Sequence, residues 1–129
     1  MKRTSLLVVL VAVAAGSAVA SDFDGSRELI CAPVTAMDCA AGVACVSGTP
    51  TEMGAPSFVR VDAAKKQVKG ARRSLPAQRV EKTPEQLLLQ GFDDGQAWAI
   101  AIDAASGRMY ATLTGRDGAI TMTGACTPL

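Results

Sequence analysis

The sequence has no histidine, and aromatic residues make up only 4% of its 129 residues. Without histidine, serine–histidine and cysteine–histidine catalysis, histidine metal sites and a histidine pH switch are excluded. The sequence also lacks a C-x-x-C pair, a serine in a nucleophile elbow and a glycine loop followed by lysine that could cradle a phosphate. We therefore expect no enzymatic activity, no metal site and no cofactor.

Charge of one sign is not in excess, because 13 basic residues face 12 acidic ones. Beyond the first 20 residues the balance is 11 basic to 12 acidic. That balance argues against a nucleic-acid or membrane-surface binder. No apolar run in residues 21–129 approaches the roughly 20 residues that a membrane-spanning helix needs.

The first 20 residues have the pattern of a secretory signal peptide. Lys2 and Arg3 precede the apolar run 6–15, and Ala18-Val19-Ala20 fits the small-residue cleavage rule. A membrane anchor is the alternative, but the run is too short to span a bilayer. The sequence predicts cleavage after Ala20, a single domain over residues 21–129, no stable membrane insertion, and a periplasmic or secreted location.

Four cysteines follow that predicted cleavage site, and an even number in an exported chain indicates two disulfides. Three pairings are possible. We favour Cys39–Cys45, because the five small residues between them can turn back easily, and Cys31–Cys126, which would join the first strand to the last. Zinc is disfavoured because the chain lacks histidine and close cysteine pairs.

Alternation of apolar and polar residues, rather than helical periodicity, dominates residues 21–129. Strands are expected at 28–32, 43–47, 57–62, 66–70, 79–83, 85–92, 96–103, 108–114 and 119–123. The inward-facing residues of the last three are expected to be Trp98, Ile100, Ile102, Met109, Ala111, Leu113, Ile120 and Met122. Turns are expected at 62–65, 93–95, 104–107 and 115–118. Residues 71–78 are interpreted as a loop, and residues 83–89 could open with a helical turn because Thr83 can cap and Pro84 suits the first position.

The last three strands, with their short loops, predict an antiparallel meander with one buried face. Connections elsewhere are also too short for parallel crossovers. We therefore expect an all-β domain, a small antiparallel barrel of about eight strands, which either fills with side chains or holds one small ligand.

The strongest charge feature lies between Arg60 and Lys82, where eight basic and two acidic residues give a local net charge of +6. This segment could attract an anionic partner, although solvated turns and a lysine-protected strand edge explain it more simply. Tyr110 could extend such a surface, although an amphipathic strand residue is the default. The candidate binding residues are Lys65, Lys66, Lys69, Arg72, Arg73 and Tyr110.

Two other features are given structural interpretations. Asp93 and Asp94 could suggest calcium or acid–base chemistry, but too few ligands are present and a polar turn is favoured. Trp98, the single tryptophan, could stack on a ligand, but its isoleucine-flanked face favours the core.

Several motifs together resemble a family of small exported bacterial proteins of unknown function with four cysteines. The motifs are Asp22-Phe23-Asp24-Gly25-Ser26, Leu29-Ile30-Cys31-Ala32, Asp38-Cys39 with Cys45, Leu89-Gln90-Gly91, Trp98 with Gly107 and Met109, and Gly124-Ala125-Cys126-Thr127. No functional residue can be transferred from that family. Size, export, disulfides and a tryptophan-bearing meander are more loosely similar to the β-barrel inhibitors of c-type lysozyme in the bacterial envelope, but no inhibitory loop can be matched.

These observations lead to one functional expectation with an alternative. We expect a periplasmic binding module that recognises an envelope protein or an anionic envelope component, and not a nucleic acid. The alternative is a carrier with an apolar barrel cavity for a small ligand.

Overall fold

The computed structural model describes residues 21–129, so the predicted signal peptide lies outside the described residues. Residues 21–129 form an all-β fold, which confirms the predicted class, and none of them forms a helix that could cross a membrane. The strands are β1 (Leu29–Cys39), β2 (Val46–Gly48), β3 (Val59–Asp62), β4 (Gln67–Lys69), β5 (Ser74–Pro76), β6 (Arg79–Lys82), β7 (Gln86–Asp93), β8 (Gln96–Asp103), β9 (Arg108–Gly115) and β10 (Gly118–Pro128).

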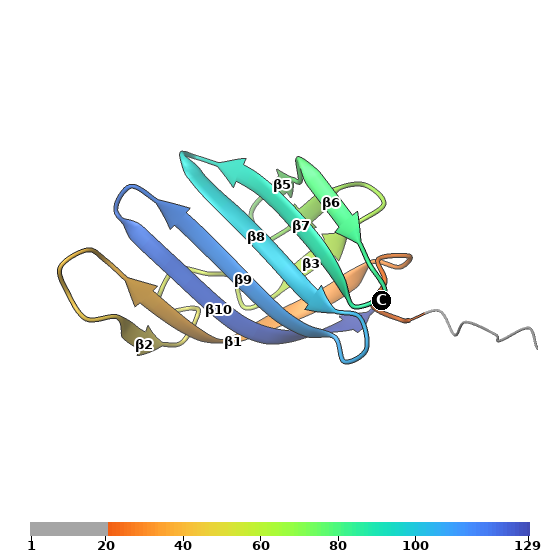
Figure 1. Cartoon of the computed structure of the whole chain (residues 1–129), viewed down its shortest axis with the longest axis horizontal. Coiled ribbons are helices and arrows are strands. Elements are labelled where there is room, and N and C mark those ends of the chain that lie inside the picture. The colour runs from red at the N-terminus through yellow and green to blue at the C-terminus, as the bar shows by residue number, and fades with distance from the viewer. Residues whose placement is uncertain (1–20) are drawn as a thin grey trace, which may run out of the picture.

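All the strands belong to one antiparallel sheet with the order β5-β4-β3-β1-β10-β9-β8-β7-β6, and β2 pairs separately with β1. The sheet curls strongly, so β3 and β5 lie behind β7 and β8 in Figure 1. Strands β7 to β10 form the predicted meander, and the structure confirms the three predicted turns between them. Because the inner face of such a sheet is concave, its inward side chains can share one interior.

The prediction of a closed barrel of about eight strands was wrong, because the ten strands form an open half-barrel. Strands β5 and β6 are the two ends of the sheet, and the chain joins them through Ala77 and Gln78. Ala77 donates its backbone N–H to Lys66, beside β4, and Gln78 donates its own to Gln90 on β7. The segment therefore changes partner at this corner, and β5 and β6 do not pair with one another.

Strands β1 and β10 are much longer than the sequence predicted, and they pair along almost their whole lengths. Pro33 indicated a strand end, but β1 continues through an irregularity between Pro33 and Thr35. Proline is tolerated at such bulges. On its other edge, β1 also changes partner here, from β3 to β2. The β1 backbone approaches Gly124 so closely that a Cβ there would collide with the Ala32 carbonyl oxygen.

Two local predictions between residues 71 and 89 were also wrong. Residues 74–76, interpreted as part of a loop, form β5 because β4 supplies a hydrogen-bonding partner. No helical turn follows Thr83. Its backbone N–H instead donates to the carbonyl of Gln86, the first residue of β7, and the Gln86 N–H donates to the Thr83 hydroxyl, which closes a tight turn.

One end of the half-barrel is tightly packed. Its fully buried side chains are Leu29, Cys31, Val61, Leu87, Leu89, Ile102 and Met109. Residues 21–28 cross this end: a Cβ on Gly25 would lie 3.0 Å from both Ala63 and Leu87, and Lys82 donates a hydrogen bond to the Gly25 carbonyl. This packed end is the main hydrophobic core.

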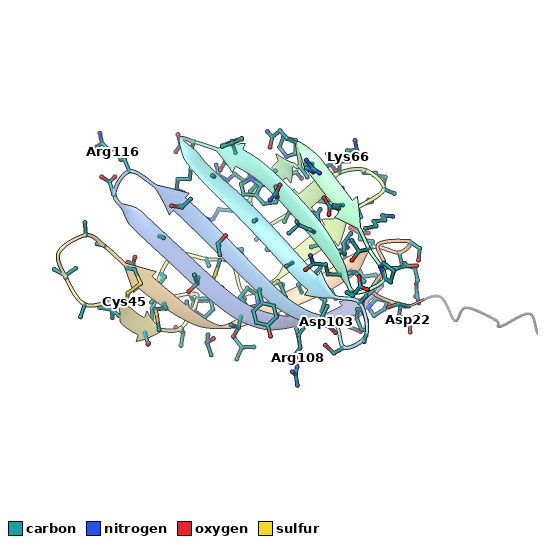
Figure 2. The ribbon with its side chains drawn as sticks, in the orientation of Figure 1. Asp22, Cys45, Lys66, Asp103, Arg108 and Arg116 are labelled. Atoms are coloured by element: carbon teal, nitrogen blue, oxygen red, sulfur yellow. A yellow bond between two sulfur atoms is a disulfide. The ribbon has the colours of Figure 1, made fainter. Side chains whose placement is uncertain are left out.

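Both predicted disulfides are confirmed. Cys31 and Cys126 are opposite one another on β1 and β10, and their bridge spans 95 positions of sequence. Cys39 and Cys45 close the short loop between β1 and β2. Figure 2 shows this second bridge, with Cys45, at the end of the molecule remote from Asp22.

Candidate ligand pocket

The end of the half-barrel away from residues 21–28 is hollow. A cavity of about 850 Å³ opens on the concave face of the sheet. Strands β8, β9 and β10 line it with Trp98, Ile100, Met109, Ala111, Leu113 and Met122. The facing wall comes from β3, β4 and β5, and the loop 51–57 borders it. The pocket is therefore enclosed by strands from both halves of the curled sheet.

Simple alternation places these side chains. On β9, Met109 and Ala111 are buried whereas Tyr110 and Thr112, which alternate with them, are exposed, and Leu113 continues the inward series. On β8, Trp98 and Ile100 follow the same rule. Because successive side chains on a strand point to opposite faces, the apolar positions predicted from the sequence form the inner wall.

Trp98 has two roles in this structure. It is only 6% exposed, which agrees with the prediction of a core residue, and it also lines the pocket. Its ring packs on Gly91, the residue opposite it on β7, where an added Cβ would lie 2.5 Å from Trp98 Cζ2. Its indole N–H has no hydrogen-bond partner among the described residues.

The mouth of the pocket contains two arginines from the turn between β4 and β5. Arg72 and Arg73 are the charged residues in its lining, and no carboxylate lines it. Arg73 forms an ion pair with Asp93 at the end of β7, across the opening between the two ends of the sheet. Arg72 forms no ion pair within residues 21–129. The mouth therefore has a net charge of +1 from these three residues.

A second hollow of about 450 Å³ adjoins the first, and the two share Leu113 and Ile120. Asp38, Asp94 and Asp117 line this second hollow, and its single cationic lining residue is Arg116. Arg116 lies beside Asp117, with Nε and Oδ1 3.3 Å apart. The concave surface is thus positive at the turn between β4 and β5 and negative beyond Ile120.

The rest of the predicted basic surface is partly neutralised within the molecule. Lys65 is 3.6 Å from Asp62, and Lys69 is 3.7 Å from Glu28. Asp62 also accepts a hydrogen bond from the Lys65 backbone N–H, which, together with the positive charges of Lys65 and Lys69, lowers the pKa of this aspartate. Lys66 occupies the turn with a φ of 52° and forms no ion pair within the described chain. The segment therefore behaves largely as solvated turns, and Arg60, Lys66, Arg72 and Lys82 are its basic residues without an ion pair among residues 21–129.

The structure does not bring Tyr110 together with the basic residues. Tyr110 is 52% exposed on the outer face of β9, opposite the side that carries Met109 and Ala111. Strands β3, β1 and β10 separate β9 from β4. A single surface made from Tyr110 and the basic segment is therefore not present.

The acidic turn after β7 has the predicted structural role. Asp94 and Gly95 both have positive φ angles, as a two-residue hairpin turn requires, and Asp93 and Gln96 pair across it. Residues 21–129 hold no group of three or more cysteine, aspartate or glutamate side chains arranged to hold a metal ion.

Sequence reasoning named most of the inner wall and offered an apolar cavity for a small ligand as the alternative function, but it did not include the wall residues among the candidate binding residues. Arg72 and Arg73 were predicted as candidates for binding, but their position at the mouth depends on β5, which was interpreted as loop. The loop 51–57 gave no signal for its role as a border.

Comparisons with known proteins identify no relative. No protein-family model, no curated protein and no solved structure matches this chain. The resemblance to small exported bacterial proteins therefore stays a prediction.

Proposed function

We propose that this protein is a non-enzymatic binding protein that holds a small, mainly apolar ligand in the open end of the half-barrel. The proposal depends on one observation, the 850 Å³ hollow on the concave face. A chain of this size can fill its interior with its own side chains, and the opposite end of this molecule is filled in that way. The hollow is therefore a specific feature of one end.

The size and lining of the hollow fit this role. Pockets for small molecules usually have volumes of about 300–1,000 Å³ and are lined mainly by apolar side chains with few polar groups. The wall here carries Trp98, Ile100, Leu113 and Met122, with charge restricted to the mouth. Transfer of an apolar ligand from water to such a wall is favourable by about 25 cal/mol for each Å² of apolar surface removed from water.

This arrangement favours the small-ligand alternative over recognition of an envelope protein. The protein-binding hypothesis combined Tyr110 with the basic segment, and these now lie on separate parts of the molecule. The hypothesis of a protein partner remains a prediction. An anionic envelope component stays compatible with the cationic mouth.

We also propose that the protein works in the periplasm or outside the cell. Two disulfides in a chain of this size are compatible with export to an oxidising compartment. Expression of the full chain in a Gram-negative bacterium, followed by cell fractionation and N-terminal sequencing, should recover a periplasmic protein that begins at Ser21. Recovery of uncut, reduced chain from the cytosol would contradict this proposal.

The ligand proposal can be tested with a neutral fluorescent probe. N-phenyl-naphthylamine is uncharged, and its emission increases in apolar surroundings. We expect saturable binding to the oxidised protein, with energy transfer from Trp98, because this tryptophan lines the pocket. Absence of saturable binding would refute the proposed function.

Two matched variants locate the probe. Ala111→Phe adds a ring on the inner face of β9, whereas Ala101→Phe adds the same ring to the outer face of β8. We expect the first variant to weaken probe binding and the second to leave it unchanged. Because overpacking can destabilise a protein by about 1–3 kcal/mol, urea unfolding must show that both variants fold. Leu113→Gln, a smaller change at a half-buried wall position, is a second inner variant. Equal binding to all four proteins would place the probe elsewhere.

A further inference from the structure

We propose that the ligand is a single-chain amphiphile with one anionic head group, bound with its chain along the apolar wall and its head beside Arg72. This inference rests on the proposed function, because it assigns a chemical class to the occupant of the same pocket. Its basis is the distribution of charge around a mainly apolar hollow.

Charge in the pocket lining is restricted to the turn between β4 and β5, and the side chains with hydroxyl groups, Thr51, Ser57 and Thr112, are uncharged. The charged lining residues, Arg72 and Arg73, are both cationic. Asp93 already neutralises Arg73, whereas Arg72 has no ion-pair partner among residues 21–129. A guanidinium offers several N–H donors that match a carboxylate or phosphate. One unpaired cation at the mouth therefore fits one anionic group.

Nearby carboxylates do not cancel this charge. Glu52 belongs to the bordering loop but does not line the pocket; its carboxylate accepts hydrogen bonds from the Thr49 backbone N–H at 2.8 Å and the Thr49 hydroxyl at 2.7 Å. Those bonds lower the pKa of Glu52 and keep its carboxylate engaged on Thr49. The other carboxylate near the mouth, Asp93, is held by Arg73.

The adjoining hollow determines the orientation of the amphiphile. Beyond Ile120 the concave surface presents Asp38, Asp94 and Asp117 against Arg116. An anionic head placed there would be repelled, whereas the wall before Ile120 accepts an alkyl chain. The favoured orientation therefore puts the head at Arg72 and the chain toward Trp98 and Leu113.

The remaining basic side chains of the segment provide a control rather than a competing site. Lys65, Lys69 and Arg79 are paired with acidic residues. Arg60 and Lys82 form no ion pair among residues 21–129, but neither lines the pocket. Lys66 resembles Arg72 in being exposed and without an ion pair in the described chain, but it does not line the pocket. Figure 2 shows Lys66 far from Arg116, which lines the second hollow. Arg72 and Lys66 therefore differ mainly in their position relative to the pocket.

The test uses three ligands that share one alkyl chain and one quencher. The ligands are ω-bromododecanoate, ω-bromododecanol and ω-bromododecyl-trimethylammonium, which are anionic, neutral and cationic. Bromine quenches tryptophan fluorescence on close approach, and Trp98 is the single tryptophan of the chain. Quenching therefore reports a chain located in the pocket. The oxidised protein obtained by expressing the full chain is titrated with each ligand, at concentrations below the critical micellar concentration of that ligand.

We expect the carboxylate to bind about fivefold more tightly than the alcohol, and the ammonium to bind most weakly, because one partly exposed charged contact contributes modestly. Arg72→Gln should reduce the ratio of carboxylate affinity to alcohol affinity from about five to about one. Lys66→Gln should keep the preference. Neither side chain forms an ion pair in the described chain, so both variants should unfold at the urea concentration of the parent protein.

The outcomes separate the two proposals. If the alcohol quenches as tightly as the carboxylate, the inference about the head group is overturned while the proposed function stands. If Arg72→Gln keeps the preference, or Lys66→Gln removes it, the assignment to Arg72 is overturned. If none of the three ligands quenches Trp98, the proposed function itself fails.

Discussion

The two disulfides should contribute very different amounts to stability, although each joins one pair of cysteines. The Cys31–Cys126 bridge spans 95 positions, and the Cys39–Cys45 bridge spans six. A crosslink restricts the unfolded chain, and the restriction grows with the length of the loop that it closes. We therefore predict a larger loss of unfolding free energy from Cys31→Ala with Cys126→Ala than from the same changes at Cys39 and Cys45.

The loop-entropy relation gives magnitudes for both variants. A loop of about 95 residues corresponds to about 4.7 kcal/mol at room temperature, and a loop of about six residues to about 2.2 kcal/mol. Cys31 is fully buried and Cys126 nearly so, and lost packing adds to the first value. The difference between the two double variants should therefore be at least about 2.5 kcal/mol.

Urea unfolding followed by Trp98 fluorescence measures these losses, because this buried side chain becomes exposed on unfolding. With a slope of about 1.5 kcal/mol per molar urea, the midpoint should fall by about 3 M without Cys31–Cys126 and by about 1.5 M without Cys39–Cys45. The parent protein in its oxidised form is the reference. Equal losses, or a larger loss for the short loop, would refute the argument from loop length.

Two further predictions concern stability. Gly91→Ala should lower the unfolding free energy by about 2 kcal/mol in the same urea assay, because the new Cβ would lie 2.5 Å from Trp98 Cζ2. Gly70→Ala is the matched control, because the nearest atom to its new Cβ is 3.7 Å away. Equal losses of stability in the two variants would contradict the packing argument. Asp62→Asn should be less stable than the parent at about pH 7 but not at about pH 2. Hydrogen bonds and cations lower the pKa of Asp62 in the folded protein. The stabilisation from this carboxylate is therefore present above the unfolded pKa near 4 and is lost as pH falls through the folded pKa. Urea curves at both pH values check this, and a gap that does not narrow in acid would show that charge is not responsible.

The sequence was sufficient for the parts of the fold that depend on local pattern. Alternation located Trp98 and Ile100 on the inner face, and the short hairpin turns fixed the order of β7 to β10. The pairing Cys31–Cys126 followed from expecting the first and last strands to meet. These features are encoded within a few neighbouring residues, or by cysteines in an oxidising compartment.

What the sequence did not predict depends on partners distant in the chain. Proline usually ends a strand. Strand β1 nevertheless continues past Pro33, because β10 pairs with it on one side while its partner on the other side changes from β3 to β2. Residues 74–76 become β5 only because β4 lies beside them. Whether the sheet closes depends on how β5 meets β6, and no local pattern encodes that junction at Ala77 and Gln78.

The same open junction links the fold to the candidate site. A complete β5–β6 ladder would close the interior, whereas here the sheet ends are joined by the chain at one corner and by the ion pair between Arg73 and Asp93 at the mouth. Residues 21–28 cover the packed end, so the hollow has its opening at the other end. Along β9, Met109 is almost completely buried, whereas Leu113 is only partly covered. Cohesion is therefore concentrated at the packed end, and the apolar wall is only partly covered by protein at Leu113 and Ile120. An apolar chain with an anionic head would cover that wall and pair with the remaining cation, Arg72, which explains why one interior can be both a core and a binding site.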